Sequence, residues 1–286
     1  MENDAGAADT RTGPAARAED AGPHAEAAGG QFVQSLARGL EVIRAFDAEH
    51  PSMTLTDVAK LTGLSRATAR RFLLTLAELG YVRTDGKYFE LTAQVLQLGY
   101  AYLSSHTLPQ LIEPVLEELS AELNESASAS VLDGADVVYV ARVHTRRIMR
   151  VGISVGTRFP AYATSMGRVL LAHLPADGLE RALRARPLEA LTPNTITDPG
   201  ALRAELSAVR ERGWCLVDQE LEVGLRSLAV PVFAPDGTVA AALNVSMSTL
   251  PGTAHSDPDP TTAALEVLPA LQSAARRIES ALRARR

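Results

Sequence analysis

The sequence is almost free of cysteine. Among its 286 residues Cys215 is the single one, which excludes an internal disulfide framework and any zinc site built on thiolates. We interpret Cys215, which follows Trp214 in an apolar stretch, as a small core residue rather than a redox sensor. The six histidines are scattered and never form the His-Glu-x-x-His spacing of a metalloenzyme, so we expect no bound metal.

Long hydrophobic runs are also missing. No segment approaches the ~20 consecutive apolar residues that cross a bilayer, and the first residues lack the apolar stretch of a signal peptide. The sequence therefore predicts a cytoplasmic protein that does not associate with a membrane. Its 46% hydrophobic and 22% charged content is ordinary for a globular protein, and its length suffices for two domains.

Signatures of enzymes are absent as well. Residues 164–167 do not form the Gly-x-Ser-x-Gly turn of a nucleophilic serine, and no histidine or acid lies at a diagnostic spacing from them. The chain also lacks a glycine-rich nucleotide-binding loop. We therefore expect no catalytic residues and no cofactor.

The most informative segment that is present, residues 55–91, has the order of a winged helix-turn-helix. A short helix over 56–62 ends at Gly63, Ser65 is suited to cap a second helix over 66–79, and Gly80 ends that helix. A β-hairpin follows, with Asp85 and Gly86 predicted to form a type I′ turn between strands over 81–84 and 87–91. In such a motif the second helix enters the major groove of DNA.

Five side chains are therefore candidates for contacts with double-stranded DNA. They lie on the polar side of the second helix and on the wing: Arg66, Thr68, Arg70, Arg71 and Lys87. The alternative is that the arginines form a solvated helix face. The net charge of −6 gives DNA binding no strong support, although residues 31–91 hold eight basic and seven acidic side chains and are flanked by acidic segments.

The composition divides the chain into four parts. Residues 1–30 are rich in alanine, glycine and acids, and we predict a disordered tail. Residues 31–91 form the DNA-binding domain, whose first helix over 31–47 turns Leu36, Leu40 and Ile43 inward. Residues 92–107 form a linker helix. Residues 108–286 alternate helical segments with short β-rich runs, among them one over 148–153, which predicts an α+β domain with a mostly antiparallel sheet.

The chain resembles the IclR family of bacterial transcription regulators over residues 32–284. The segments that carry the resemblance are the helix-turn-helix, residues 98–105 (LGYAYLSS) and residues 155–172 (VGTRFPAYATSMGRVLLA). They are most similar to the PcaR/PcaU/PobR subgroup, whose members control aromatic-acid catabolism through the β-ketoadipate pathway. The resemblance implies that residues 108–286 form a GAF-like domain that binds a small effector.

The local chemistry indicates where a carboxylate effector would bind. Thr164 is suited to cap a helix whose first N–H groups belong to Ser165, Met166 and Gly167, and a helix N-terminus favours anions. Packing of the helix against a neighbouring strand is the alternative role for Gly167.

The resemblance adds further positions to the effector pocket. Ser227 lies where some family members carry a cysteine. Asn244 and Ser246 alternate on one strand and so share a face, although such a face is often exposed to solvent. Arg142 and Arg150 are candidates to pair with a second carboxylate of the effector. The alternative is that they are exposed arginines of a strand. We expect Asp218, with Glu220, to form hydrogen bonds or gate the pocket, because a carboxylate repels an anionic ligand.

Together these observations predict a ligand-responsive regulator of aromatic-acid catabolism that binds operator DNA as a homodimer or homotetramer. The linker helix would transmit the signal between the domains. Two alternatives stay open. In the first, the effector is an aliphatic acid such as glyoxylate or pyruvate. In the second, the protein is a small-molecule enzyme or sensor whose helix-turn-helix docks another protein.

Overall fold

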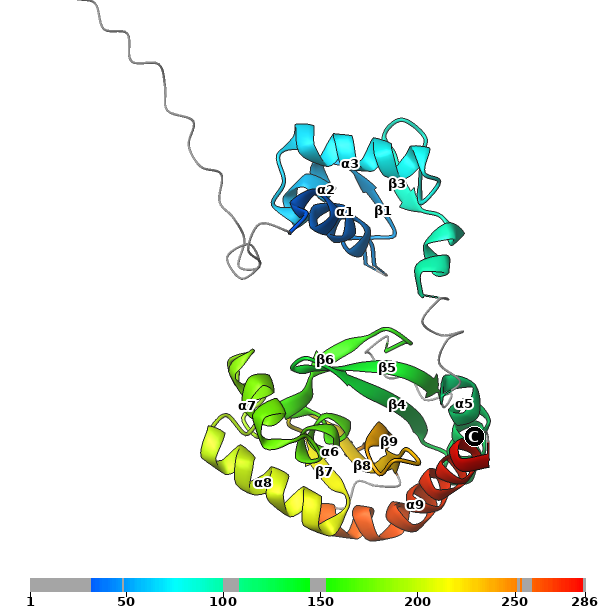
Figure 1. The fold of residues 1–286 in the computed structure, drawn as a ribbon, viewed down its shortest axis with the longest axis vertical. Coiled ribbons are helices and arrows are strands. Elements are labelled where there is room, and N and C mark those ends of the chain that lie inside the picture. Colours follow the sequence, from blue (N-terminus) through cyan, green and yellow to red (C-terminus); the bar gives the residue numbers. More distant parts are fainter. Residues whose placement is uncertain are drawn as a thin grey trace, which may run out of the picture. The chain divides into compact units, whose positions relative to one another are not determined.

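The computed structural model describes residues 32–47, 49–99, 108–144, 153–250, 253 and 259–284. The predicted tail over 1–30 lies outside the described residues, as do residues 100–107 of the predicted linker. The chain divides into two compact units between Tyr102 and Leu103 (Figure 1). This division falls within the predicted linker.

The first unit is a winged helix-turn-helix, as predicted. Its elements are α1 (Gln34–Arg44), β1 (Ser52–Thr54), α2 (Leu55–Thr62), α3 (Arg66–Glu78), β2 (Val82–Thr84) and β3 (Tyr88–Leu91). The three strands form an antiparallel sheet in the order β1-β3-β2. Strand β1 was not predicted, because three residues before a helix carry no detectable alternation, and its pairing with β3 exists only in the folded unit.

Side-chain caps fix where the two helices of the motif begin and end. The hydroxyl of Thr54 accepts from the Asp57 N–H while the Asp57 carboxylate accepts from the Thr54 N–H, which is a capping box at the start of α2. Ser65 caps α3 by accepting from the Thr68 N–H at 3.2 Å. Gly63 ends α2 at φ +66°, a conformation that glycine adopts without strain. The predicted caps at Ser65 and Gly63 are confirmed.

The core of this unit lies between α1, α2, α3 and the small sheet. Val42, Val58 and Leu73 are fully buried in it. The expectation that Leu36 and Leu40 face inward is wrong, because they are 64% and 47% exposed. Helix α1 spans only 11 residues, and its inward side is held by Val42 instead. A second apolar stripe on α1 thus remains at the surface.

The wing hairpin differs from the predicted type I′ turn. That turn needs positive φ at both Asp85 and Gly86, but of these two only Gly86 has it, at +98°. The Asp85 carboxylate instead accepts from the N–H groups of Lys87 and Tyr88, and the Thr84 hydroxyl accepts from the Gly86 N–H. These side-chain hydrogen bonds replace the tight turn with a longer loop, because Asp85 bonds to the backbone just ahead of it.

The segment after the wing is described only at its start. A 3₁₀ turn, η1 (Ala93–Val95), is followed by helical residues 96–99. Thr92 and Gln94 attach it to the end of α3, since the Thr92 hydroxyl donates to the Gly80 carbonyl and the Gln94 amide to the Leu79 carbonyl. The linker helix over 92–107 therefore stays a prediction beyond Gly99.

The second unit contains a six-stranded antiparallel sheet, as predicted. Its strands run in the order β6-β5-β4-β9-β8-β7 and are β4 (Ser126–Asp133), β5 (Asp136–Val143), β6 (Arg158–Pro160), β7 (Cys215–Asp218), β8 (Leu225–Phe233) and β9 (Val239–Ser248). The predicted run over 148–153 lies almost wholly outside the described residues, and Ile153 itself is not in a strand. The likeness to a GAF domain stays a prediction.

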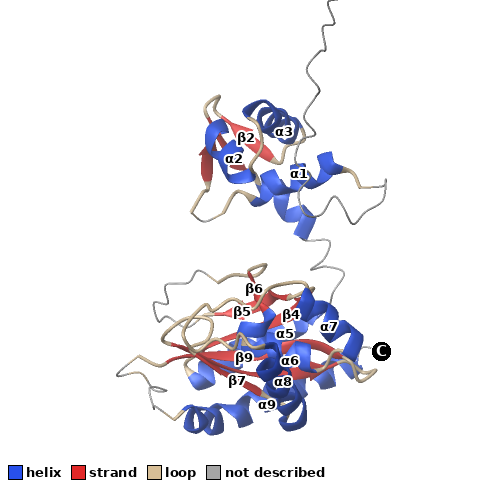
Figure 2. Ribbon diagram, turned by 90° about the vertical axis from the view of Figure 1, so that its left-hand side faces the viewer, coloured by secondary structure: helices blue, strands red, loops and turns tan. Residues whose placement is uncertain are grey.

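Helices cover both faces of this sheet (Figure 2). On one face α5 (Leu108–Leu123) and α9 (Pro260–Ala284) pack over a core that includes Leu116, Leu243 and Ile278. The other face carries η2 (Ala161–Ala163), α6 (Ser165–Ala172), α7 (Ala176–Arg184) and α8 (Pro199–Arg212). Cys215 belongs to this second core, and burial raises the pKa of its thiol to about 12. Its prediction as a core residue is confirmed.

Helix α6 is buried over its whole length because Gly167 lets it approach η2. A Cβ at residue 167 would lie 2.1 Å from the Ala161 carbonyl oxygen, which no side chain tolerates without a backbone shift. We expect Gly167→Ala to destabilise the second unit severely, by about 3 kcal/mol or more, as overpacking at a rigid backbone does.

Gly178→Ala on α7 is the matched control. Its added Cβ meets neighbours only at 3.8 Å, and alanine is the better helix former, so we expect a gain of about 0.5–1 kcal/mol. Urea unfolding followed by the fluorescence of Trp214, the single tryptophan, reports on the second unit alone. Equal stability of the Gly167→Ala variant and the wild type would contradict this account of α6.

Candidate DNA-binding and effector-binding sites

The exposed side of α3 presents three of the predicted DNA contacts. Arg66, Arg70 and Arg71 are exposed, and none forms an ion pair with any residue that the structure describes. Thr68 is half-buried, and its hydroxyl forms a hydrogen bond with the Ser65 hydroxyl at 2.9 Å. Thr68 therefore serves the cap of α3, while the three guanidinium groups remain available for phosphate or base contacts.

Lys87 lies in the loop of the wing. Its ammonium group is 4.9 Å from the centre of the Tyr88 ring, so a cation–π contact orients it without neutralising its charge. Loop and helix together carry the four basic side chains that the sequence predicts to contact DNA.

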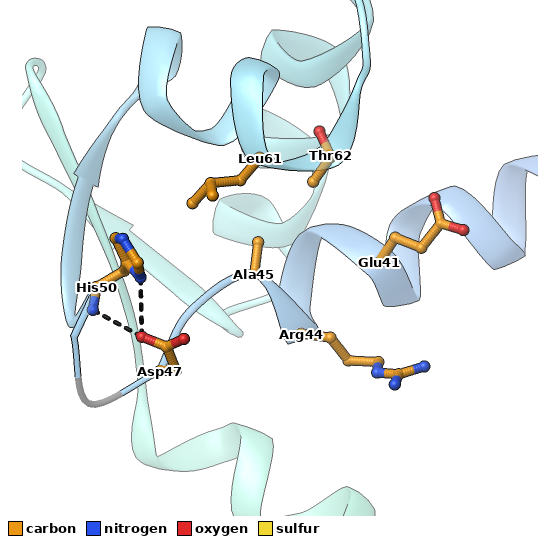
Figure 3. Close-up of a pocket in the computed structure, with 7 residues that line it drawn as sticks. All are labelled: Glu41, Arg44, Ala45, Asp47, His50, Leu61 and Thr62. Atoms are coloured by element: carbon orange, nitrogen blue, oxygen red, sulfur yellow. Dashed lines mark hydrogen bonds and ion pairs between the residues drawn. The ribbon is translucent and has the colours of Figure 1, made fainter. Parts of the chain in front are cut away.

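A wide concavity lies elsewhere on this unit, between the ends of α1 and α2 (Figure 3). On one side the Asp47 carboxylate accepts from the His50 N–H at 2.7 Å and contacts the His50 ring at 3.0 Å, while Leu61 and Thr62 face it from α2. The hydrogen bond from the His50 backbone lowers the pKa of Asp47. This carboxylate already caps the turn after α1, and we assign the concavity no ligand.

The second unit contains a pocket between α6 and the sheet. It is narrow, since its side chains leave a cavity of about 20 Å³ between them. It is lined by Tyr139, Ile153, Ala163, Thr164, Ser165, Met166, Val217, Leu221, Leu225, Ser227, Asn244 and Ser246. A few polar groups within mostly apolar walls are typical of a small-molecule site.

Four of the predicted effector residues form one buried hydrogen-bonded cluster in this pocket. The hydroxyls of Ser165 and Ser227 are 2.7 Å apart, although they lie 62 residues apart in sequence. The Asn244 amide nitrogen donates to the Ser227 hydroxyl at 2.7 Å and to the Ser246 hydroxyl at 3.1 Å. The predicted convergence of a helix start and two strands is therefore present in the structure.

The start of α6 supplies backbone donors to the same pocket. The Thr164 hydroxyl accepts from the Gly167 N–H at 3.1 Å, so the predicted cap is confirmed. The N–H groups of Ser165 and Met166 have no hydrogen-bond partner among the described residues. Two free donors at a helix N-terminus can hold a carboxylate.

Three of the predicted residues do not line the pocket. Gly167 faces Ala161, and its N–H is taken by the cap. Asp218 forms an ion pair with Arg226 at 2.8 Å. Arg142 donates to the Ser128 hydroxyl at 3.0 Å, and burial lowers its pKa.

The strand register relates Arg142 to the pocket. Ser128 is the register partner of both Arg142 and Asn244, so these three residues form one row across the sheet. Arg150 lies outside the described residues.

Sequence reasoning missed several lining residues. Tyr139 of β5 lines the pocket. Burial raises the pKa of its phenol to about 12, so it remains a neutral hydrogen-bond donor. Ser128 and Ser130 on the neighbouring strand β4 are fully buried but are not among the lining residues. The alternation Ser-Ala-Ser-Ala-Ser over 126–130 indicates that these serines share one face of the strand, because residues of period two do so.

A buried ion pair holds helix α6 next to the pocket. Arg168 of α6 donates to the Glu220 carboxylate at 2.7 Å and 2.5 Å and to the Tyr162 carbonyl at 2.8 Å. The carboxylate also accepts from the Ile196 N–H, and the Glu220 carbonyl accepts from the Thr195 hydroxyl. The expectation that Glu220 forms hydrogen bonds is met, although its partner is an arginine of α6.

Both units match models of one protein family. Residues 35–86 match the IclR helix-turn-helix domain, and residues 100–279 match the C-terminal domain of the bacterial transcriptional regulator IclR. The chain therefore belongs to the IclR family of transcriptional regulators, which bind DNA and are not enzymes.

Proteins of similar sequence narrow the assignment from the family to a subgroup. The chain is 47% identical to the Pca regulon regulatory protein of Pseudomonas putida, covering 75% of this chain and 74% of that protein. It is 40% identical to the p-hydroxybenzoate hydroxylase transcriptional activator of Acinetobacter baylyi, over 76% and 82% of the two chains. These relatives support the predicted subgroup of ligand-responsive regulators of aromatic-acid catabolism.

A solved structure shares the fold. The IclR homologue of Microbacterium hydrocarbonoxydans in complex with 4-hydroxybenzoate has a TM-score of 0.74 to this chain at 26% identity, covering 87% of this chain and 99% of that one. Across the described part of the present chain, no helix has the length and apolarity to span a membrane.

The arginines of α3 give a first test of the DNA interface. We expect Arg70→Ala to weaken binding to a cognate duplex by about 1–3 kcal/mol, because a phosphate or base contact is lost. The duplex is enriched from a random library with the wild-type protein, and affinity is measured by mobility shift. Arg210→Ala, which removes an exposed arginine of α8, should leave affinity unchanged. Equal losses in both variants would reject the assignment.

The Arg168–Glu220 pair gives a second test. We expect Arg168→Met to destabilise the second unit by about 3–5 kcal/mol, because it leaves a buried carboxylate without its counter-ion. Arg181→Met, which breaks the exposed Arg181–Asp177 pair, should cost no more than about 0.5 kcal/mol. Urea unfolding followed by Trp214 fluorescence measures both, and similar losses would show that burial of the pair has no consequence.

Proposed function

We propose that this chain is an operator-binding regulator whose effector is a small aromatic carboxylate held in the pocket of its second unit. The observation that carries the proposal is the cluster of Ser165, Ser227 and Asn244 at the N-terminus of α6, inside apolar walls. The likeness to regulators of aromatic-acid catabolism supports the choice of ligand class.

The carboxylate binds at the start of α6. It accepts from the free N–H groups of Ser165 and Met166 and from a serine hydroxyl, and the partial positive charge of the helix N-terminus stabilises it. Arg142, in the same row of the sheet as Asn244, adds positive potential from the far side of β4. Asp218 does not repel the ligand, because Arg226 neutralises it.

The ring occupies the apolar part of the pocket. Ile153, Met166, Val217, Leu221 and Leu225 line this part of the pocket, and their side chains are the apolar contacts available to a ring. The homologue from Microbacterium hydrocarbonoxydans was crystallised with 4-hydroxybenzoate, which agrees with a ring acid here. An aliphatic acid such as glyoxylate would leave much of this apolar surface uncovered.

DNA binding uses two copies of the chain. In a homodimer or homotetramer, two α3 helices enter successive major-groove faces of a palindromic operator, about one helical turn apart. The effector shifts the population between arrangements that fit the operator and arrangements that do not. The linker segment over 92–107 connects the pocket unit to the DNA-binding unit and transmits this shift.

A panel of acids tests the ligand class. Thermal unfolding is measured with 4-hydroxybenzoate, protocatechuate and glyoxylate, each at increasing concentration. A ligand at about a hundred times its dissociation constant stabilises a protein by ~2.7 kcal/mol. We expect the two ring acids to raise the melting temperature of the second unit. A shift with glyoxylate alone would replace the aromatic effector by an aliphatic one.

Two substitutions test the site. We expect Ser227→Ala and Asn244→Ala to weaken calorimetric affinity for the stabilising acid by about 1–3 kcal/mol each, because a buried polar contact is lost. Binding to the enriched duplex without ligand should not change. Ser207→Ala on the exposed side of α8 is the control. Unchanged acid affinity in both pocket variants would remove these residues from the site.

A further inference from the structure

The exposed side of α3 carries a leucine next to a pair of arginines. Leu74 is 42% exposed. It lies four positions after Arg70 and three positions after Arg71, and residues at these two spacings are neighbours on the surface of a helix. An apolar side chain is therefore part of the same surface as two of the predicted DNA contacts.

The core of the first unit does not account for this leucine. Leu73 and Leu76 provide the packing of α3, with exposed fractions of 0% and 8%, and both belong to the core that contains Val42 and Val58. Leu74 is not part of that core. Single exposed leucines are common on protein surfaces, but this one lies on the helix that a helix-turn-helix inserts into the major groove.

The charges of α3 indicate which part of the helix meets a polyanion. Arg66, Arg70 and Arg71 are exposed and place three positive charges in its first two turns. The next charged residue along the helix is Glu78, four positions after Leu74, and its carboxylate is repelled by phosphate. The part of α3 that favours DNA therefore ends between Arg71 and Glu78, and Leu74 lies within reach of it.

Thymine offers the group that matches a leucine in the groove. Each base pair presents hydrogen-bond donors and acceptors at its major-groove edge, and the C5-methyl of thymine is the apolar group among them. An arginine can bind guanine O6 and N7 or a phosphate, whereas a leucine forms none of these hydrogen bonds. Against any other base edge, Leu74 would remove water from polar groups without replacing their hydrogen bonds.

We propose that Leu74 recognises thymine through its C5-methyl group in each half-site of the operator, while the neighbouring arginines bind guanine or phosphate. This rests on operator binding by α3 in the proposed function and adds a rule about the sequence that is bound. Each half-site then contains at least one thymine whose methyl group, and not its hydrogen bonds, contributes to affinity.

Removal of single methyl groups from the DNA tests the rule. A duplex is enriched from a random library with the wild-type chain, and each thymine is then replaced by uracil, which retains base pairing and loses only the methyl group. We expect at least one thymine per half-site at which mobility shift gives an affinity about fourfold lower, the value of one buried methyl-sized group. Replacement in both half-sites should lower affinity about 15-fold.

Substitutions assign the methyl contact to a residue. In Leu74→Ala the ratio of thymine to uracil affinity at the sensitive position should fall from about four to about one. Leu79→Ala is the matched control and should retain the ratio, because Leu79 is a 56% exposed leucine that lies five positions after Leu74, on another side of the helix. Leu74 carries no charge, so its loss should also leave the salt dependence of binding unchanged. Circular dichroism checks that both variants are folded.

The outcomes separate this rule from the proposed function. Equal affinity for thymine and uracil at every position would overturn the rule and leave operator binding in place. A ratio that Leu74→Ala retains would assign the methyl contact to another side chain and would also overturn it. If Leu74→Ala lowers affinity for both duplexes equally and changes the sedimentation of the free chain, Leu74 contacts a second copy of the chain and the rule is wrong. If no duplex is enriched, the rule and operator binding both fail.

Discussion

The buried ion pair between Arg168 and Glu220 is the interaction on which the second unit depends. Arg168 is 1% exposed and joins α6 to Glu220, whose carboxylate and carbonyl also hold residues 195–196. Leu221 and Leu225, just beyond Glu220, are walls of the pocket. Since a buried charge is stable only with its partner in place, this pair fixes the helix start and the walls relative to one another.

Close packing and free polar groups meet at the same helix. Gly167 allows α6 to lie against Ala161, which brings Ser165 within 2.7 Å of Ser227 on β8. The polar cluster that results is buried among apolar walls, where a hydrogen bond is stronger than it is in water.

Local signals in the sequence predicted much of the fold. Ser65 and Gly63 define α3 and its turn through bonds to residues at most three positions away, and Thr164 defines the start of α6 in the same way. The type I′ turn was wrong because the Asp85 carboxylate binds the loop backbone. The inward orientation of Leu36 and Leu40 was wrong because helical periodicity cannot show which of two apolar stripes meets the core.

The sequence by itself determined the order of elements, the caps and the residue types that a DNA helix and a carboxylate site require, since these follow from short-range backbone chemistry. The tertiary structure decided which of the predicted polar residues meet. It placed Ser165, Ser227 and Asn244 in one cluster, turned Gly167 toward Ala161 and paired Asp218 with Arg226. Strand order and helix packing set such contacts between residues far apart in the chain, and no local pattern records them.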